Sequence, residues 1–152
     1  MIQASIANPN EFSDIPYQIL KETCRLVLEG EGVKKARISI ALVDNATIHS
    51  INKRFLDHDE PTDVITFPLS NSGASKLEGE LVLGMEVAQQ QAQDLGHSRT
   101  EELQLYVIHG LLHLVGYDDL TTKDIRAMRA RERHYLQLLN LPDIASRETA
   151  GD

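Results

Sequence analysis

The feature that most constrains this 152-residue chain is an apolar stretch from Leu103 to Val115 that carries two histidines. Nine of its thirteen residues are apolar, which predicts a helix without a solvent-facing side, placed in the core of a domain. His109 and His113 are four residues apart, so they lie one turn apart on the same side of that helix. Two imidazole rings in an apolar setting cost free energy unless their nitrogens are used. The pattern therefore predicts a buried helix with a functional pair of histidines.

A bound metal ion would use these nitrogens, because neutral imidazole is a preferred ligand of zinc. A catalytic zinc site usually takes three protein ligands and leaves one position open. Gly116 can adopt a left-handed conformation and turn the chain back, which returns Asp119 toward the helix. A carboxylate oxygen is an acceptable zinc ligand, although it is less selective than imidazole. The sequence thus predicts His109, His113 and Asp119 as metal ligands, and the alternative is a pair of satisfied core histidines.

The residues near the histidine pair argue against zinc-protease chemistry and leave the general base unidentified. In the H-E-x-x-H motif a glutamate follows the first histidine and acts as general base, whereas Gly110 follows His109 here. Asp118 is a candidate acceptor that orients a ligand histidine, or alternatively a residue that stabilises the turn. His97 is a candidate supporting residue near the cleft, or alternatively a surface residue.

The remaining hydrophobic patterns predict a single α+β domain, in which helices pack on a small mixed β-sheet and the metal site lies on the central buried helix. We expect strands near residues 2–7, 37–43, 64–67 and 80–83, and helices near 16–30, 45–55, 86–95 and 121–139. Ser98 and Glu101 have the spacing of a capping box ahead of the apolar helix. The domain is expected to occupy residues 1–142, followed by a polar tail at 143–152.

The charge of the chain limits how it can bind nucleic acid. Its 15 basic and 23 acidic residues give a net charge of −8, which argues against binding by bulk electrostatics. Five of the basic residues nevertheless fall between Lys123 and Arg133. This basic strip is either a solvated helix face or a patch that attracts nucleic acid locally.

The composition also bears on the compartment. The single cysteine, Cys24, cannot form an intramolecular disulfide, and the N-terminus has no secretory signal pattern. No apolar run approaches the roughly 18 residues of a membrane-spanning helix. We therefore expect a soluble cytoplasmic protein with no membrane partner.

Two blocks of the sequence extend the pattern beyond the histidine pair. Residues 109–119 read H-G-L-L-H-L-V-G-Y-D-D, and residues 61–68 read P-T-D-V-I-T-F-P. The first closely resembles the signature H-G-x-L-H-L-x-G-Y-D-H of the YbeY family of metal-dependent endoribonucleases, and the second resembles that family's P-T-D-V-L-S-F-P segment. The resemblance covers most of the chain from Val43 to Leu139, in the right order and spacing.

The resemblance implies a specific activity. Members of the family are small cytoplasmic α+β proteins that bind one zinc ion (Zn2+) and act on single-stranded RNA. They take part in ribosomal RNA maturation, notably at the 3′ end of the small-subunit RNA, and in ribosome quality control. By position, the resemblance implies that His109 and His113 are metal ligands and that the reaction is metal-assisted hydrolysis of a phosphodiester bond.

The chain departs from the family pattern at three positions. Asp119 stands where the family has a third histidine, and a carboxylate there would admit divalent ions other than zinc. Glu80 stands where aspartate is usual, a conservative change. Leu56 stands where the family has an arginine that is thought to meet RNA phosphate, and Arg54 is a candidate replacement. Two alternative functions stay open: a non-catalytic, metal-binding factor associated with the ribosome, and a metallohydrolase of another substrate such as a peptide.

Overall fold

The computed structural model describes residues 1–56, 63–71 and 74–145 of the chain. Its strands are β1 (Ile2–Ala7), β2 (Ala36–Val43), β3 (Val64–Pro68) and β4 (Leu77–Gly84). Its helices are α1 (Tyr17–Gly30), α2 (Asn45–Leu56), α3 (Met85–Leu95), α4 (Arg99–Leu114) and α5 (Thr122–Leu138). The structure contains every strand and helix that the hydrophobic patterns predict.

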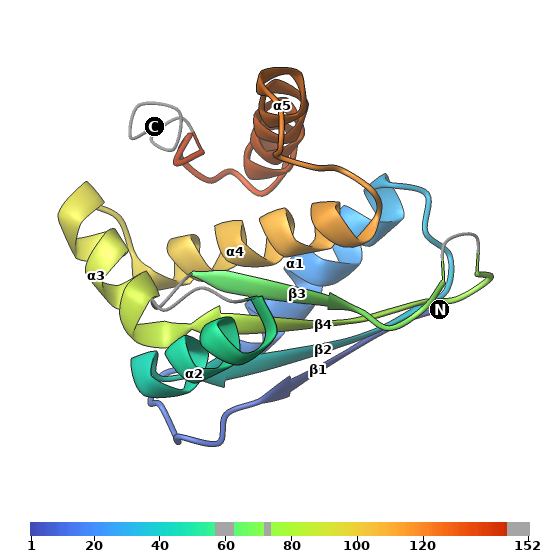
Figure 1. Cartoon of the computed structure of the whole chain (residues 1–152). Helices are drawn as coiled ribbons and strands as arrows, with labels where there is room; N and C mark the ends of the chain where they lie inside the picture. Colours follow the sequence, from blue (N-terminus) through green and yellow to red (C-terminus); the bar gives the residue numbers. More distant parts are fainter. Residues whose placement is uncertain (57–62, 72–73, 146–152) are drawn as a thin grey trace.

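The four strands form one mixed sheet in the order β1-β2-β4-β3 (Figure 1). β1 pairs with β2 and β2 pairs with β4 in parallel, whereas β3 runs antiparallel to β4. β3 therefore lies at one edge of the sheet, next to the end of α4. The predicted α+β domain with a small mixed sheet is confirmed.

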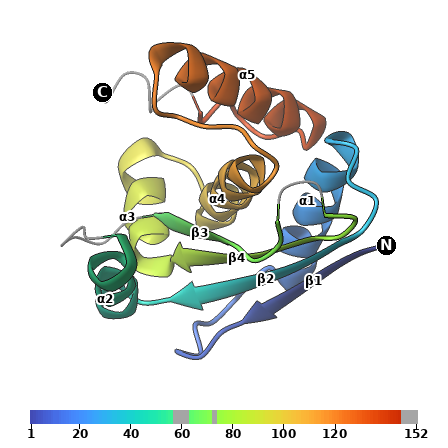
Figure 2. The same ribbon diagram turned by 45° about the vertical axis from the view of Figure 1, so that its right-hand side comes forward.

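Helices cover both faces of the sheet. α4 lies across one face between α1 and α3, and α5 packs on the outer side of α4 (Figures 1 and 2). α2 covers the other face, where Ile48 packs with Ile65 and Val82. Successive side chains of a strand point to opposite faces, so Leu81 and Leu83 join the main core under α4 while Val82 joins the smaller one. Within the described ranges, no helix is both long and apolar enough to cross a membrane.

The apolar helix α4 is buried, as predicted, and a glycine brings it close to the sheet. A Cβ atom on Gly110 would lie 2.7 Å from Leu81 Cδ2 and 3.3 Å from Thr66 Oγ1. Only glycine therefore allows this approach without a shift of neighbouring atoms. The buried apolar residues of the helix are Leu103, Leu105, Tyr106, Val107, Ile108, Leu111 and Leu112.

The ends of α4 and α5 follow the predicted capping residues. The Ser98 hydroxyl accepts a hydrogen bond from Glu101 N, and the Glu101 carboxylate accepts one from Ser98 N. Because Ser98 is the N-cap of this capping box, α4 begins at Arg99 and not near Leu103. Thr121 caps α5 by accepting a hydrogen bond from Asp124 N.

The main core continues beyond the expected domain boundary at residue 142. Ile144 is 7% exposed and Ala145 is fully buried against that core. Residues 143–145 therefore pack with the domain, and the rest of the predicted tail, 146–152, lies outside the described residues. The division of the chain into a domain and a polar tail stays a prediction.

Candidate metal centre

His109 and His113 project from the last turns of α4 into an open cavity of about 490 Å³, which we call the metal cavity. Asp63 and Thr66 contribute to its wall from the side of β3. The histidine side chains are 18% and 26% exposed, although the rest of α4 is almost entirely buried. A solvent molecule or a substrate can therefore reach both rings.

The structure brings the three predicted metal ligands together. The Nε2 atoms of His109 and His113 are 3.2 Å apart, and Asp119 Oδ2 lies 3.7 Å from the first and 3.5 Å from the second. Ligand atoms bound to zinc at about 2.0–2.1 Å in tetrahedral geometry are separated by about 3.3 Å. Two imidazole nitrogens and a carboxylate oxygen are also the donor types that zinc accepts. The donor set and its spacing therefore fit a divalent metal ion.

A tight turn after α4 carries Asp119 to the two histidines. Gly116 has φ +113°, a conformation that favours glycine, and Tyr117 N donates a hydrogen bond to Leu112 O over 2.9 Å. Asp118 Oδ1 accepts a hydrogen bond from Asp119 N over 3.0 Å. Of the two roles considered for Asp118, this bond matches stabilisation of the turn, and His109 has a different acceptor.

That acceptor is Glu132 of α5. Its Oε2 atom lies 2.6 Å from His109 Nδ1, and its side chain is fully buried. A carboxylate only accepts hydrogen bonds, so it holds the ring proton on Nδ1 and leaves the lone pair on Nε2 directed into the metal cavity. Arg129 Nη1 donates to both Glu132 oxygens, over 2.7 and 2.8 Å, which compensates the buried charge.

Sequence reasoning did not find this pair as part of the site. Arg129 and Glu132 fall within the basic strip between Lys123 and Arg133, where charged residues commonly face solvent. A usable signal was present, since the two opposite charges are three residues apart and Met128 lies beside them at a core position. Which side of α5 faces α4 depends on tertiary packing, so the link to His109 follows only from the structure.

Two of the four other basic residues of the strip form ion pairs. Arg131 Nε lies 2.6 Å from a carboxylate oxygen of Glu31, and Arg133 Nε lies 3.2 Å from one of Asp143. The strip is therefore neither a uniformly solvated face nor a patch directed at the metal cavity. Its arginines mainly attach α5 to the rest of the domain.

Two other expected residues lie away from the metal ligands. His97 Nε2 pairs with the buried Glu102 near the start of α4, about 10 Å along the helix from His109. Arg54 is exposed in the last turn of α2 and does not line the metal cavity. Leu56 ends α2, and its side chain, like Pro61 and Thr62 of the second sequence block, lies outside what the structure describes.

The ionisable side chains that the structure places around the metal cavity are acidic or imidazole groups. Asp63 lies on its wall and accepts a hydrogen bond from Val64 N over 2.7 Å, and Asp119 provides the second carboxylate. Among the described residues that line this cavity there is no lysine or arginine. The centre is thus suited to a cation, and a polyanion bound there needs positive groups from a neighbouring surface.

Comparison with known protein families covers nearly the whole chain. The family model described as Endoribonuclease YbeY matches residues 5–140. The chain belongs to the Endoribonuclease YbeY family. The Endoribonuclease YbeY of Carboxydothermus hydrogenoformans is 38% identical over 123 residues, which cover 81% of this chain and 85% of that protein.

Other similar proteins give the same result for the YbeY family. The Endoribonuclease YbeY of Bacillus cereus is 32% identical over 141 residues, covering 86% of this chain and 88% of that protein. That of Rhodopirellula baltica is 42% identical over 113 residues, covering 73% and 58%. The solution structure of TM1509 from Thermotoga maritima is 25% identical and has a TM-score of 0.63, with 99% of this chain and 93% of that chain covered. The likeness to TM1509 extends over the entire α+β fold.

Proposed function

We propose that this chain is a metal-dependent endoribonuclease that acts in ribosomal RNA processing. The observation that carries the proposal is the triad of His109, His113 and Asp119, whose ligand atoms lie within 4.8 Å of one another on the wall of an open cavity. Three protein ligands with solvent access are the arrangement of catalytic zinc sites. Membership of the YbeY family supports RNA as the substrate.

The residues of the centre have separate roles in hydrolysis of a phosphodiester bond. A divalent ion held by the triad would supply Lewis-acid chemistry that polarises the phosphodiester and activates water. Glu132 keeps the proton on Nδ1 of His109, and this orients the Nε2 lone pair toward the ion position. Arg129 holds Glu132 in place, and Asp119 adds a negative charge that offsets the charge of the ion.

Zinc is the ion that we propose for this site. The two imidazole nitrogens favour zinc, and the separations between the three ligand atoms suit a small tetrahedral ion. The carboxylate of Asp119 widens the range of divalent ions that the site accepts, because oxygen ligands discriminate less among them.

The proposed substrate is single-stranded RNA, with maturation of the 3′ end of the small-subunit ribosomal RNA as the biological reaction. We further propose that the chain works with the ribosome in the cytoplasm and contributes to ribosome quality control. The support is the resemblance of residues 109–119 and 61–68 to the two family blocks. The open metal cavity is also accessible to a flexible strand.

Cleavage of a labelled single-stranded RNA by the zinc-loaded chain tests the proposal. We expect cleavage by the wild type and by a His134→Ala control, whose histidine is exposed on α5. His113→Ala and a chelator should each lower the rate by more than about 100-fold, because each removes the ion from the site. Absence of cleavage by wild-type protein shown to hold zinc, or full cleavage by His113→Ala, would overturn the proposal.

A further inference from the structure

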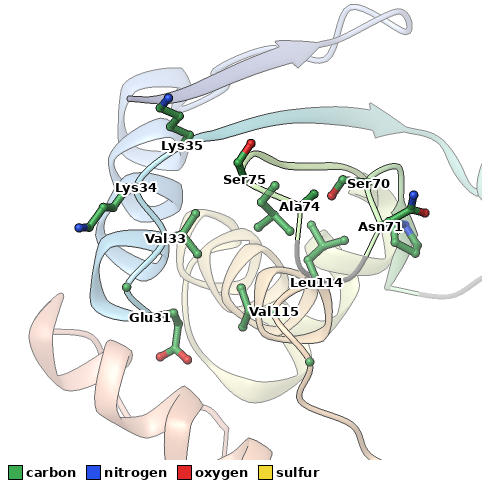
Figure 3. A pocket seen from close by; sticks show the side chains of 14 residues that line it. Glu31, Val33, Lys34, Lys35, Ser70, Asn71, Ala74, Ser75, Leu114 and Val115 are labelled. Carbon is green, nitrogen blue, oxygen red and sulfur yellow. The ribbon is translucent and has the colours of Figure 1, made fainter.

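A second cavity, of about 670 Å³, adjoins the metal cavity. Pro68 and Leu114 line both cavities, so the two lie side by side. Figure 3 shows the second cavity between the end of α4, the connection from α1 to β2, and residues 70–71 and 74–75, which lie between β3 and β4 in the sequence. Residues from these three segments include Val115, Lys34, Lys35, Asn71 and Ser75.

The second cavity is lined by apolar and polar side chains, and its cations lie at the rim. Val33, Leu77 and Val115 form the apolar part of the lining, beside serine and asparagine side chains. Lys34 and Lys35 are exposed, and their side chains extend outward from the rim in Figure 3. Within the part of the chain that the structure describes, neither ammonium group has an ion-pair partner. Both lysines are thus available to an external anion.

The carboxylate at this cavity is already neutralised. Glu31 is the acidic group among the described residues that line it, and its oxygen accepts hydrogen bonds from Arg131 Nε, over 2.6 Å, and from the Tyr135 hydroxyl. The charge that the second cavity presents to solvent is therefore positive. The metal cavity beside it has two carboxylates and, among its described lining residues, no lysine or arginine.

We infer that the second cavity binds the nucleotides next to the scissile phosphate, with Lys34 and Lys35 contacting RNA phosphates at the rim and a base resting on the apolar side chains of the lining. This inference rests on the proposed endoribonuclease function. A single strand can turn its bases inward and keep its phosphates in solvent, and this matches apolar side chains below a cationic rim. Because Pro68 and Leu114 line both cavities, nucleotides in the second cavity would lie next to the metal centre.

Salt-dependent RNA binding tests this inference. The full-length, zinc-loaded chain is titrated against a short fluorescent single-stranded RNA whose phosphorothioate linkages resist cleavage. The variant is Lys34→Gln/Lys35→Gln, and the control Lys21→Gln/Lys123→Gln removes the same charge from positions that line neither cavity. Each phosphate contact on a single strand contributes about 0.7 to the slope of log K against log salt. We expect the slope to fall by about 1.4 in the variant and to stay unchanged in the control.

The outcomes separate this inference from the function on which it rests. Equal slopes in the variant and the wild type, or an equal loss in the control, would overturn the subsite, even if the wild type cleaves RNA. Lysine-dependent binding by a wild-type chain that cleaves no RNA would support the subsite and overturn the proposed activity. A lower slope and slower cleavage at low RNA concentration, both confined to the variant, would support both.

Discussion

At the scale of single residues, the buried carboxylate of Glu132 shows how the centre is supported. Removing one partner of a buried ion pair leaves an uncompensated charge and typically costs about 3–5 kcal/mol, whereas replacing both partners together leaves no uncompensated charge. A change at Glu132 alone would thus mix a folding defect with an effect on His109. Changing Arg129 and Glu132 together separates the two effects.

We expect Arg129→Gln/Glu132→Gln to lower zinc affinity by roughly 10–100-fold, because a neutral amide is a weaker acceptor for His109 Nδ1 than the carboxylate that orients the ring. The free energy of unfolding of the metal-free protein should change by less than the roughly 3–5 kcal/mol of a broken buried pair. Competition with a chromogenic chelator measures the affinity, and urea unfolding measures the stability. Glu22→Gln/Arg25→Gln is the matched control, since that pair is also three residues apart but exposed on α1. A folded variant with wild-type zinc affinity would contradict this role of Glu132.

At the scale of elements, the close contact of α4 with β4 and β3 places the histidines beside the metal cavity. Gly110 lies between His109 and His113 in the helical turn that meets Leu81. Alanine is intrinsically better than glycine inside a helix by about 1 kcal/mol. Here that gain competes with a Cβ atom 2.7 Å from a buried methyl group.

Gly110→Ala should lower the free energy of unfolding by about 1–2 kcal/mol, because overpacking a core costs more than the helix gains. Leu81→Val shortens the side chain that the new Cβ meets, so the double variant should recover part of the loss. Urea unfolding of the two single variants and the double variant gives the coupling between the positions. Wild-type stability of Gly110→Ala would show that α4 can move away from the sheet at little cost.

The helices and strands also show which features of the structure can be predicted from the sequence alone. The capping box at Ser98, the left-handed turn at Gly116 and the burial of α4 depend on neighbouring residues and on helical periodicity, so all three were predictable. The order of the strands and the side of α5 that faces α4 depend on contacts between distant segments. For that reason the sequence predicts that a local turn brings Asp119 to the histidine pair. It does not predict the contact of Glu132 with His109, which is 23 residues away.

At the scale of the whole molecule, a polar cluster joins α5 to the end of α1. Burial alone would raise the pKa of Glu31, but hydrogen bonds from Tyr135 and Arg131 outweigh it and lower the pKa below its ordinary value of 4.5. Burial and the nearby Glu31 carboxylate raise the pKa of Tyr135, so its hydroxyl stays protonated as a donor. The cluster therefore stabilises the fold through an ionised Glu31.

A lowered pKa stabilises the folded state above pH 4.5, and this stabilisation is lost as the pH falls through the folded-state value. Glu31→Gln should therefore be less stable than the wild type at pH 7, and the two proteins should converge in acid. Thermal unfolding between about pH 7 and pH 3 measures the difference. Glu22→Gln, on the exposed side of α1, should keep a nearly constant difference from the wild type. A stability difference between Glu31→Gln and the wild type that persists below the folded-state pKa of Glu31 would contradict this dependence of stability on ionised Glu31.

The hydrogen bonds from Arg129 through Glu132 to His109 also join α5 to α4. Any ligand that binds only the folded protein adds its binding free energy to the folding equilibrium. Because that coupling is reciprocal, a change that destabilises the packing of α5 lowers the affinity for the ion, and binding of the ion stabilises that packing. The stability of α5 thus depends on whether the metal site is filled, although α5 contributes no ligand atom to that site.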